Sequence, residues 1–273
     1  MAELMLRPLS VGEIIDHSFA IYRRQFAALL LITLLANGIP AILGIYVTAS
    51  GGGDAHPLLF LVSLIANVAL GSLATAATVF LVSESYLGRS ISAGDAFQRA
   101  VKYIWPLVLL SIGVGLLIGL GFLLLIVPGF IALCGLILAT QALVLEDLTP
   151  SEARNRSWNL TKGFRWKMLG LLVVLGIIIL IPSIGLGVLV ETTSTAKITG
   201  QVDTQTIVWV AVQQLITIVI YPLLYCALTI AYYDLRVRKE GFDLELLEST
   251  LAHALPQGRV SQSRDLPNSH TFG

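Results

Sequence analysis

The chain has 273 residues, of which 56% are hydrophobic and only 12% are charged, and its mean hydropathy is +0.84. Soluble domains carry about 25% charged residues, so this chain lacks the polar surface of a soluble protein and is predicted to lie in a membrane. The formal net charge is zero, and no nucleic-acid partner is expected.

Five apolar blocks follow one another, at about 26–49, 58–83, 105–145, 167–190 and 207–233. About 20 residues cross the hydrocarbon of a bilayer, so the third block is long enough for two crossings. Pro128 and Gly129 predict a turn within it, between helices at about 105–127 and 129–147. Spanning backbone must bond within its own segment, and the alternating pattern of a membrane barrel is missing. The prediction is therefore six transmembrane helices.

Lys and Arg predict the orientation. With six spans both termini share one side, which holds 16 of the 17 basic residues, while the other side holds only Lys197. An excess of Lys and Arg marks the cytoplasmic side, so both termini are expected in the cytoplasm. Residues 1–24 lack an apolar run followed by a small-residue cleavage site, and no signal peptide is expected.

One sequence pattern occurs in three short segments, at 10–26, 92–104 and 149–165. Each begins with a hydroxyl residue and carries an acidic residue three positions later, a pattern that caps a helix; the pairs are Ser10 with Glu13, Ser92 with Asp95, and Thr149 with Glu152. In the first two segments the apolar residues follow one helical stripe, and in the third they are interleaved with Arg154 and Thr161. Basic residues occupy the opposite faces, which predicts amphipathic helices in the cytoplasmic membrane interface.

The resulting fold class is all-α integral membrane, with six transmembrane helices and three interfacial helices arranged as three helical-hairpin repeats at 10–83, 92–147 and 149–233. The alternative is that any polytopic protein has capped polar loops. Pro40 and Pro182 predict kinks in the first and third units. Residues 1–247 form one predicted membrane domain, and the polar tail at 248–273 is predicted to be disordered. Small residues in i,i+4 series predict helix contacts, among them Asn67, Gly71 and Thr75, and Ser111, Gly115 and Gly119.

No catalytic, metal or cofactor site is predicted. The six span interiors contain no Asp, Glu, Lys, Arg or His, which argues against a proton relay. Their Asn and Gln residues are interpreted as contacts between helices. Cys134 and Cys226 lie in apolar segments and are interpreted as small buried hydrophobes. Glu152 and Arg156 are interpreted as an i,i+4 salt pair.

The cytoplasmic rim holds the best candidate residues. Acidic residues end the returning spans, level with basic residues of the short helices, and opposite charges at a bilayer boundary are expected to pair. These residues are candidates for charge pairs or for contacts with anionic lipid headgroups: Arg23, Arg24, Glu84, Arg99, Glu146, Asp147, Arg156, Lys162, Asp234 and Arg236.

Three passages carry a family resemblance: "LRPLSVGEIIDHSFAIYRRQF" at 6–26, "LVLEDLTPSEARNRSWNLTKGFRWK" at 143–167 and "YYDLRVRKEGFDLELL" at 232–247. Together they resemble the membrane domain of the glycerophosphoryl diester phosphodiesterase family, which also occurs as stand-alone bacterial proteins. The resemblance implies a multi-span helical protein of the bacterial inner membrane. In fused members the chemistry belongs to a separate barrel of about 250 residues, for which the 26 residues after 247 are too few, so hydrolase activity is not carried over.

Two function classes remain open, and a third, an intramembrane enzyme, lacks catalytic groups. The first is a non-enzymatic inner-membrane protein that interacts with lipid or with a soluble or membrane protein partner. The second is a transporter or permease-like subunit for a lipid-related solute. A water-filled cavity bounded by Pro40, Pro182 and Pro222 favours transport, whereas a closed bundle with a basic cytoplasmic face favours the partner role.

Overall fold

The computed structural model describes residues 7–50, 56–193 and 204–242. All regular structure within these ranges is helical. Six helical stretches are long and apolar enough to span a membrane, at Phe26–Ala49, Pro57–Tyr86, Ala93–Leu124, Ile126–Glu146, Arg165–Gly185 and Ala211–Glu240. The prediction of an all-α, multi-pass membrane protein is confirmed, while the tail at 248–273 lies outside the described residues.

The three predicted short helices are present, as α1 (Val11–Arg24), α5 (Ala93–Ala100) and α9 (Pro150–Thr161). Ser10, Ser92 and Thr149 each accept a hydrogen bond from the backbone N–H three residues later. The side chains of Glu13 and Glu152 return the bond to the cap backbone, which completes two capping boxes. The capping prediction is confirmed, and the interfacial position of these helices stays a prediction.

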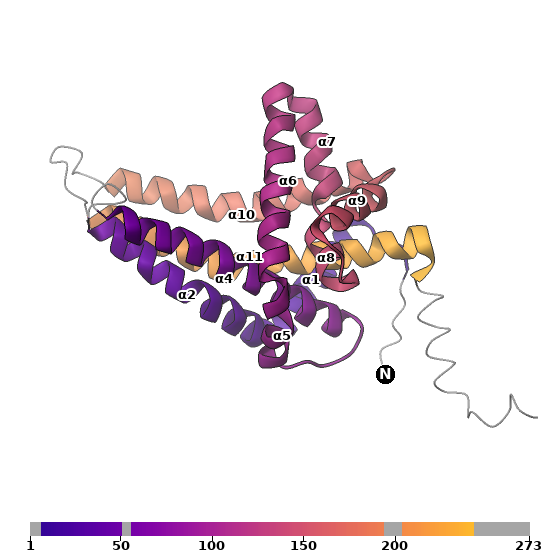
Figure 1. Cartoon of the computed structure of the whole chain (residues 1–273), viewed down its shortest axis with the longest axis horizontal. Coiled ribbons are helices and arrows are strands. Elements are labelled where there is room, and N and C mark those ends of the chain that lie inside the picture. Colours follow the sequence, from indigo (N-terminus) through magenta and orange to yellow (C-terminus); the bar gives the residue numbers. More distant parts are fainter. Residues whose placement is uncertain (1–6, 51–55, 194–203, 243–273) are drawn as a thin grey trace, which may run out of the picture.

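Four long helices run alongside one another: α2 (Phe26–Ala49), α4 (Pro57–Tyr86), α10 (Arg165–Thr193) and α11 (Thr204–Glu240). The short helices α1, α5 and α9 gather toward the end of the bundle from which the C-terminal part of α11 projects (Figure 1). We call this end the rim. It holds the predicted candidate residues, because they lie on the short helices or next to them.

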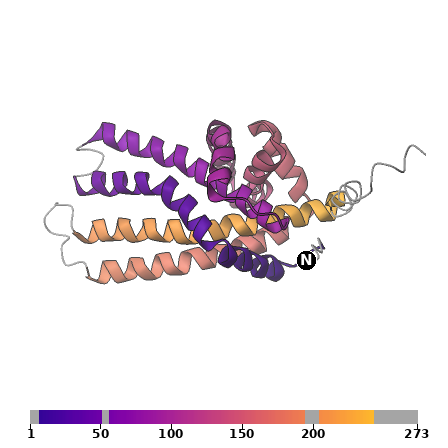
Figure 2. The same cartoon turned by 90° about the horizontal axis from the view of Figure 1, so that it is seen from below.

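The middle hairpin has a different orientation from the other two. It consists of α6 (Ile104–Leu124), α7 (Ile126–Leu136) and α8 (Ala139–Glu146). Helices α6 and α7 run across the direction of the four long helices, and Figure 2 shows them nearly end-on while the others lie lengthwise. The order of short helix and hairpin recurs three times along the chain, but the hairpins do not share one direction. The threefold repeat stays a prediction.

The turn in the middle hairpin lies earlier than predicted. Leu125 is extended, with φ −162° and ψ 151°, and Pro128 and Gly129 lie inside the first turn of α7. Proline is tolerated there because the first N–H groups of a helix have no partner within the helix. A second break, at Ile137 and Leu138, separates α7 from α8 and was not predicted.

The predicted helix-contact role of three glycines is wrong. A Cβ added to Gly71, Gly115 or Gly119 would meet nothing within 4 Å, so no helix approaches closely there. The close approach lies at Gly121 instead, where an added Cβ would be 3.0 Å from the Cα of Gly129. A small residue thus marks a close contact only where a neighbouring helix arrives.

Candidate functional site

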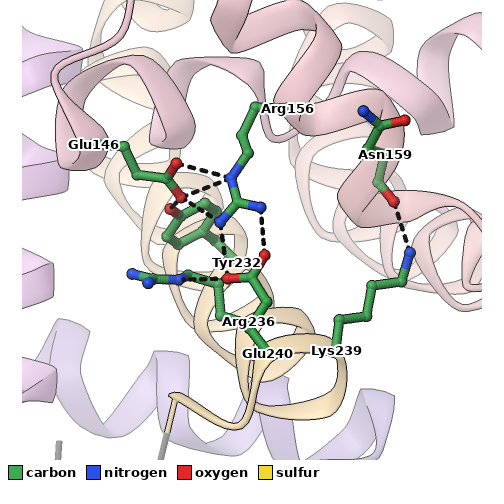
Figure 3. Close-up of polar contacts among 7 residues, drawn as sticks. All are labelled: Glu146, Arg156, Asn159, Tyr232, Arg236, Lys239 and Glu240. Carbon is green, nitrogen blue, oxygen red and sulfur yellow. Dashed lines mark hydrogen bonds and ion pairs between the residues drawn. The ribbon is translucent and has the colours of Figure 1, made fainter. Parts of the chain in front are cut away.

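Arg156 on α9 joins the ends of two other helices (Figure 3). Its Nε donates to both Glu146 oxygens at 2.9 and 2.8 Å, and its Nη2 donates to Glu240 at 2.8 Å. Glu146 ends α8 and Glu240 ends α11. Tyr232 donates its hydroxyl to Glu146, and Arg236 donates to Glu240 at 3.1 Å. Hydrogen bonds to Glu240 and then Glu146 raise the pKa of Arg156, which keeps the guanidinium charged as the centre of the cluster.

Asp234 on α11 anchors the segment before α1. Its side chain is 0% exposed and accepts from the backbone N–H of Leu9 at 2.6 Å, from Arg238 at 3.1 Å and from the Lys167 ammonium. Lys167 and Arg238 also donate to the Leu9 carbonyl, at 2.6 and 2.7 Å. Both backbone polar groups of Leu9 are therefore bonded, and two cations neutralise the buried carboxylate.

Two further predicted acids bind cations at the rim. Glu84 at the end of α4 contacts Arg89 at 2.5 Å and Arg99 of α5 at 3.7 Å. Asp147 accepts from Lys102 at 3.0 Å and from the hydroxyl of Tyr103 at 2.8 Å. The structure therefore brings a carboxylate of a long helix to α5, as it does to α9.

Three predicted cations have no such partner. Arg23, Arg24 and Lys162 are exposed, and among the described residues none of them lies within 4.0 Å of a carboxylate. They lie at the C-terminal ends of α1 and α9. The structure thus divides the predicted rim residues into internal charge pairs and exposed cations.

The predicted salt pair between Glu152 and Arg156 is wrong. Glu152 accepts from the backbone N–H of Thr149 at 3.0 Å and from its hydroxyl at 2.7 Å, so the capping box occupies the carboxylate. Arg156 turns to Glu146 and Glu240 instead. The spacing of four residues allowed the pair, but the cap is the more local partner.

Helix α9 also completes the backbone bonding at the break between α7 and α8. Ser157 donates to the Gly135 carbonyl at 2.8 Å and accepts from the Leu138 N–H at 3.2 Å. Thr161 donates to the same carbonyl at 3.2 Å. Buried backbone polar groups need partners in a membrane protein, so these hydroxyls explain why the chain can break there.

The Trp158 ring packs against Gly135, and we predict that this contact tolerates no side chain. A Cβ on Gly135 would lie 2.4 Å from the ring, so Gly135→Ala should destabilise the protein by roughly 1–3 kcal/mol through overpacking. The measurement is the free energy of unfolding by SDS titration in mixed micelles. In a Trp158→Ala background the same change should cost less than about 1 kcal/mol, because the clash is gone.

The control for this prediction is Gly170→Ala, because an added Cβ there meets nothing within 4 Å. It should be neutral or stabilise α10 by about 0.5–1 kcal/mol, as alanine does in a helix interior. Equal costs of Gly135→Ala with and without Trp158 would contradict the packing explanation.

We predict that the start of α1 loosens in acid. Hydrogen bonds from the Ser10 backbone, the Ser10 hydroxyl and Arg7 lower the pKa of Glu13 from 4.5 to about 2. A depressed carboxylate pKa contributes stability that is complete above pH 4.5 and is lost as the pH falls toward 2. Amide hydrogen exchange in the first turn of α1 should therefore accelerate across this window beyond its intrinsic pH dependence. In Glu13→Gln this additional pH dependence should disappear.

A polar pocket lies between the helices, away from the rim charges. Its volume is about 360 Å³, and its walls come from α2, α4, α6, α8 and α11. Pro222 lines it, but Pro40 and Pro182 do not, so the cavity differs from the one considered for transport. Eleven of its lining residues carry a hydroxyl or carboxamide side chain: Thr33, Asn37, Asn67, Ser72, Thr75, Thr78, Ser111, Thr140, Thr217, Tyr221 and Tyr225.

A metal site would need several His, Cys, Asp or Glu side chains close together among the described residues. No group of three or more His, Cys, Asp or Glu side chains that could hold a metal ion occurs among them. Cys134 and Cys226 are buried and unpaired, which confirms their interpretation as buried hydrophobes. The candidate polar sites among the described residues are therefore the rim charges and the pocket.

The sequence missed several members of these sites. Lys167 and Glu240 lie next to predicted span ends, and their charge can be read from the sequence. Their bonding partners cannot, because those lie far away along the chain. Leu9 acts through its backbone, which leaves no signal in a side-chain pattern. Ser157 lies in the predicted third interfacial helix, but its partner is a helix break that was not predicted.

The comparison with protein families gives one match. A domain family of unknown function, DUF7847, matches residues 20–235. The chain belongs to this family. The matched range includes the pocket, Asp234 and Arg156, and it ends before Glu240. No curated protein and no solved structure matches the chain.

Proposed function

We propose that this chain is a non-enzymatic, multi-pass protein of the bacterial inner membrane, with cytoplasmic termini, that contacts anionic lipid headgroups through its rim. The observation that carries the proposal is the exposure of Arg23, Arg24 and Lys162 without a carboxylate partner among the described residues. Anionic headgroups offer the complementary charge, at about 1 kcal/mol per cation near the surface.

Exposed tryptophans support a membrane boundary at this end. Trp105 lies near the start of α6 and is 75% exposed, and Trp166 lies near the start of α10 and is 86% exposed. Trp158 lies on α9 and is 37% exposed. Tryptophan favours the headgroup level of a bilayer, where one part of the ring system is wet and the other apolar.

The test is lipid binding by the full chain in nanodiscs. The double variant Arg23→Gln/Arg24→Gln should weaken retention of phosphatidylglycerol by roughly 30-fold, because two contacts of about 1 kcal/mol each are lost. The control, Arg7→Gln/Arg89→Gln, removes the same charge from exposed cations that already pair with Glu13 and Glu84. Equal retention by the two double variants would contradict a headgroup contact at the rim.

A protein partner is the other form of this proposal. Mild-detergent purification from native membranes, followed by mass spectrometry of co-purifying protein and lipid, distinguishes the two. A stoichiometric soluble enzyme or ATPase would make this chain its membrane subunit. One enriched anionic lipid class without a protein would support the lipid contact.

A second candidate function is a transporter or permease-like subunit for a lipid-related solute. The pocket of about 360 Å³ favours it, because polar side chains line a cavity among apolar helices. Flux of a labelled solute in reconstituted vesicles would test it, with a pocket-filling variant as the control.

A further inference from the structure

We propose that the polar pocket binds the uncharged, hydroxyl- or ester-bearing headgroup of a lipid that enters sideways from the bilayer. This site goes beyond the rim contacts proposed above and shares none of their residues, and it names a ligand class for the pocket that favours the second candidate function. The pocket volume of about 360 Å³ falls within the range of about 300–1,000 Å³ that small-molecule sites occupy. Ordered water alone would need on the order of ten molecules to fill it.

The pocket lies along the middle of the long helices. Its α4 residues run from Asn67 to Thr78 within a helix that spans Pro57–Tyr86. Gly71 forms part of this wall, and an added Cβ there meets nothing within 4 Å. The pocket therefore has free volume next to Gly71, and no neighbouring helix packs closely against α4 at this position.

Several lining groups have hydrogen-bonding capacity that the protein does not use. The side chains of Asn67, Ser111 and Thr140 make no hydrogen bond to another described residue. Thr78 is 1% exposed, and its buried hydroxyl has no partner in the described part of the chain. A buried hydroxyl without a partner is costly, and a ligand oxygen in the pocket would supply one.

Other lining groups are bonded to their own helices. Asn37 donates to the Thr33 carbonyl at 2.9 Å and Thr75 donates to the Gly71 carbonyl at 2.9 Å. Asn37 is therefore not the contact between helices that was predicted. Its carboxamide oxygen keeps acceptor capacity for a ligand hydroxyl, whereas the Thr75 hydroxyl also contacts the Tyr225 hydroxyl of α11.

The lining also decides the charge of the ligand. None of the described lining residues is Asp, Glu, Lys, Arg or His. An ionised phosphate would lose its hydration without gaining a cation, which is strongly unfavourable. A neutral glycerol ester or a long-chain alcohol meets the hydroxyl and carboxamide groups without this cost.

The exposed edge of the pocket explains entry from the bilayer. Val68 and Tyr221 line the pocket and are 42% and 40% exposed. The exposed neighbours on α4 are apolar, with Leu64 50% and Ile65 58% exposed. An acyl chain can lie along this apolar face of α4 while its headgroup occupies the polar pocket.

Two carbonyls next to Pro222 accept hydrogen bonds from side chains of two other helices. Proline cannot donate to the carbonyl four residues earlier, and Thr33 of α2 donates to this Ile218 carbonyl at 3.0 Å. Tyr22 of α1 donates to the next carbonyl, of Val219, at 2.6 Å. The Ile218 carbonyl, which proline leaves without a helix donor, is thus satisfied by Thr33, a residue that also lines the pocket.

The test is a titration of the full chain in nanodiscs, followed by native mass spectrometry. The probes are monooleoylglycerol, free glycerol and the lysophosphatidic acid with the same acyl chain. Monooleoylglycerol should bind, and Gly71→Leu should weaken it by roughly tenfold or more by filling the pocket. Gly119→Leu is the matched control, because its added Cβ also meets nothing within 4 Å and it lies outside the pocket, so it should bind as the wild type does.

A second variant keeps the test valid if Gly71→Leu does not fold. Thr78→Val preserves the side-chain shape and should weaken monooleoylglycerol binding by roughly 3- to 10-fold, the effect of one hydrogen bond. Equal binding by wild type, Gly71→Leu and Thr78→Val would overturn the proposal, as would equal binding of the lysophosphatidic acid. Glycerol that binds as tightly would overturn the lipid source and identify a soluble polyol instead.

The rim variant separates this inference from the proposed function. Arg23→Gln/Arg24→Gln should lower phosphatidylglycerol retention and leave monooleoylglycerol binding unchanged. Loss of both lipids in this variant would overturn the independence of the pocket.

Discussion

Asp234→Ala should destabilise the protein by about 3–5 kcal/mol, the cost of leaving buried charges without their partner. The carboxylate is 0% exposed and neutralises Lys167, which is 15% exposed. It also holds the backbone N–H of Leu9 at 2.6 Å. The measurement is the free energy of unfolding by SDS titration in mixed micelles.

The control is Asp147→Ala, because that carboxylate also pairs with a cation but is 69% exposed. Its loss should cost at most about 1 kcal/mol, as for other surface pairs. The double variant Asp234→Leu/Lys167→Met should recover part of the stability, since it removes the most buried cation together with its carboxylate. The recovery should be incomplete, because Arg238 and the Leu9 N–H still lose their partner. If Asp234→Ala and Asp147→Ala cost the same, the burial argument is wrong.

Arg156→Ala should cost about 3 kcal/mol, the second largest effect. The side chain is 26% exposed and bridges Glu146 and Glu240, which are 19% and 28% exposed. Its removal leaves Glu146 without a cation, while Glu240 keeps only Arg236. The unfolding free energy should fall, and hydrogen exchange should rise at the ends of α8 and α11.

Arg156→Lys separates charge from geometry. Lysine keeps the charge but lacks the planar fork that donates to two carboxylates at once, so it should recover only part of the loss. Arg89→Ala is the control, because Arg89 is 62% exposed and Arg99 remains near Glu84. Full recovery by lysine would show that the bidentate geometry has no role.

Local features of the sequence predicted much of the fold. Hydropathy over about 20 residues predicts a spanning helix whatever its neighbours are, so six such helices were found. A capping box needs only four consecutive residues, and the starts of α1, α5 and α9 were correct. The turn after α6 was misplaced by a few residues, because Pro128 marks either a turn or the first turn of a helix.

The candidate site was predictable by composition but not by pairing. The count of Lys and Arg predicted that the acidic and basic residues lie at one end of the protein. In the structure Arg156 pairs with Glu240, 84 residues away, and Asp234 bonds the Leu9 backbone, 225 residues away. No local pattern contains those separations. Glu152 also shows that composition does not predict pairing. It bonds Thr149 in the capping box and not Arg156, the predicted partner.

The sequence by itself determined that this is a membrane protein of six apolar helices with three capped, charged helices at one end, since burial in lipid and cap bonds depend on segments of 4 to about 20 residues. Only the tertiary structure decided where those helices meet. Gly71 could equally have marked a helix contact or an open wall, because a missing side chain permits both. The direction of α6 and α7, across that of the four long helices (Figure 1), and the polar pocket that α6 helps to line depend on packing between segments far apart in the chain.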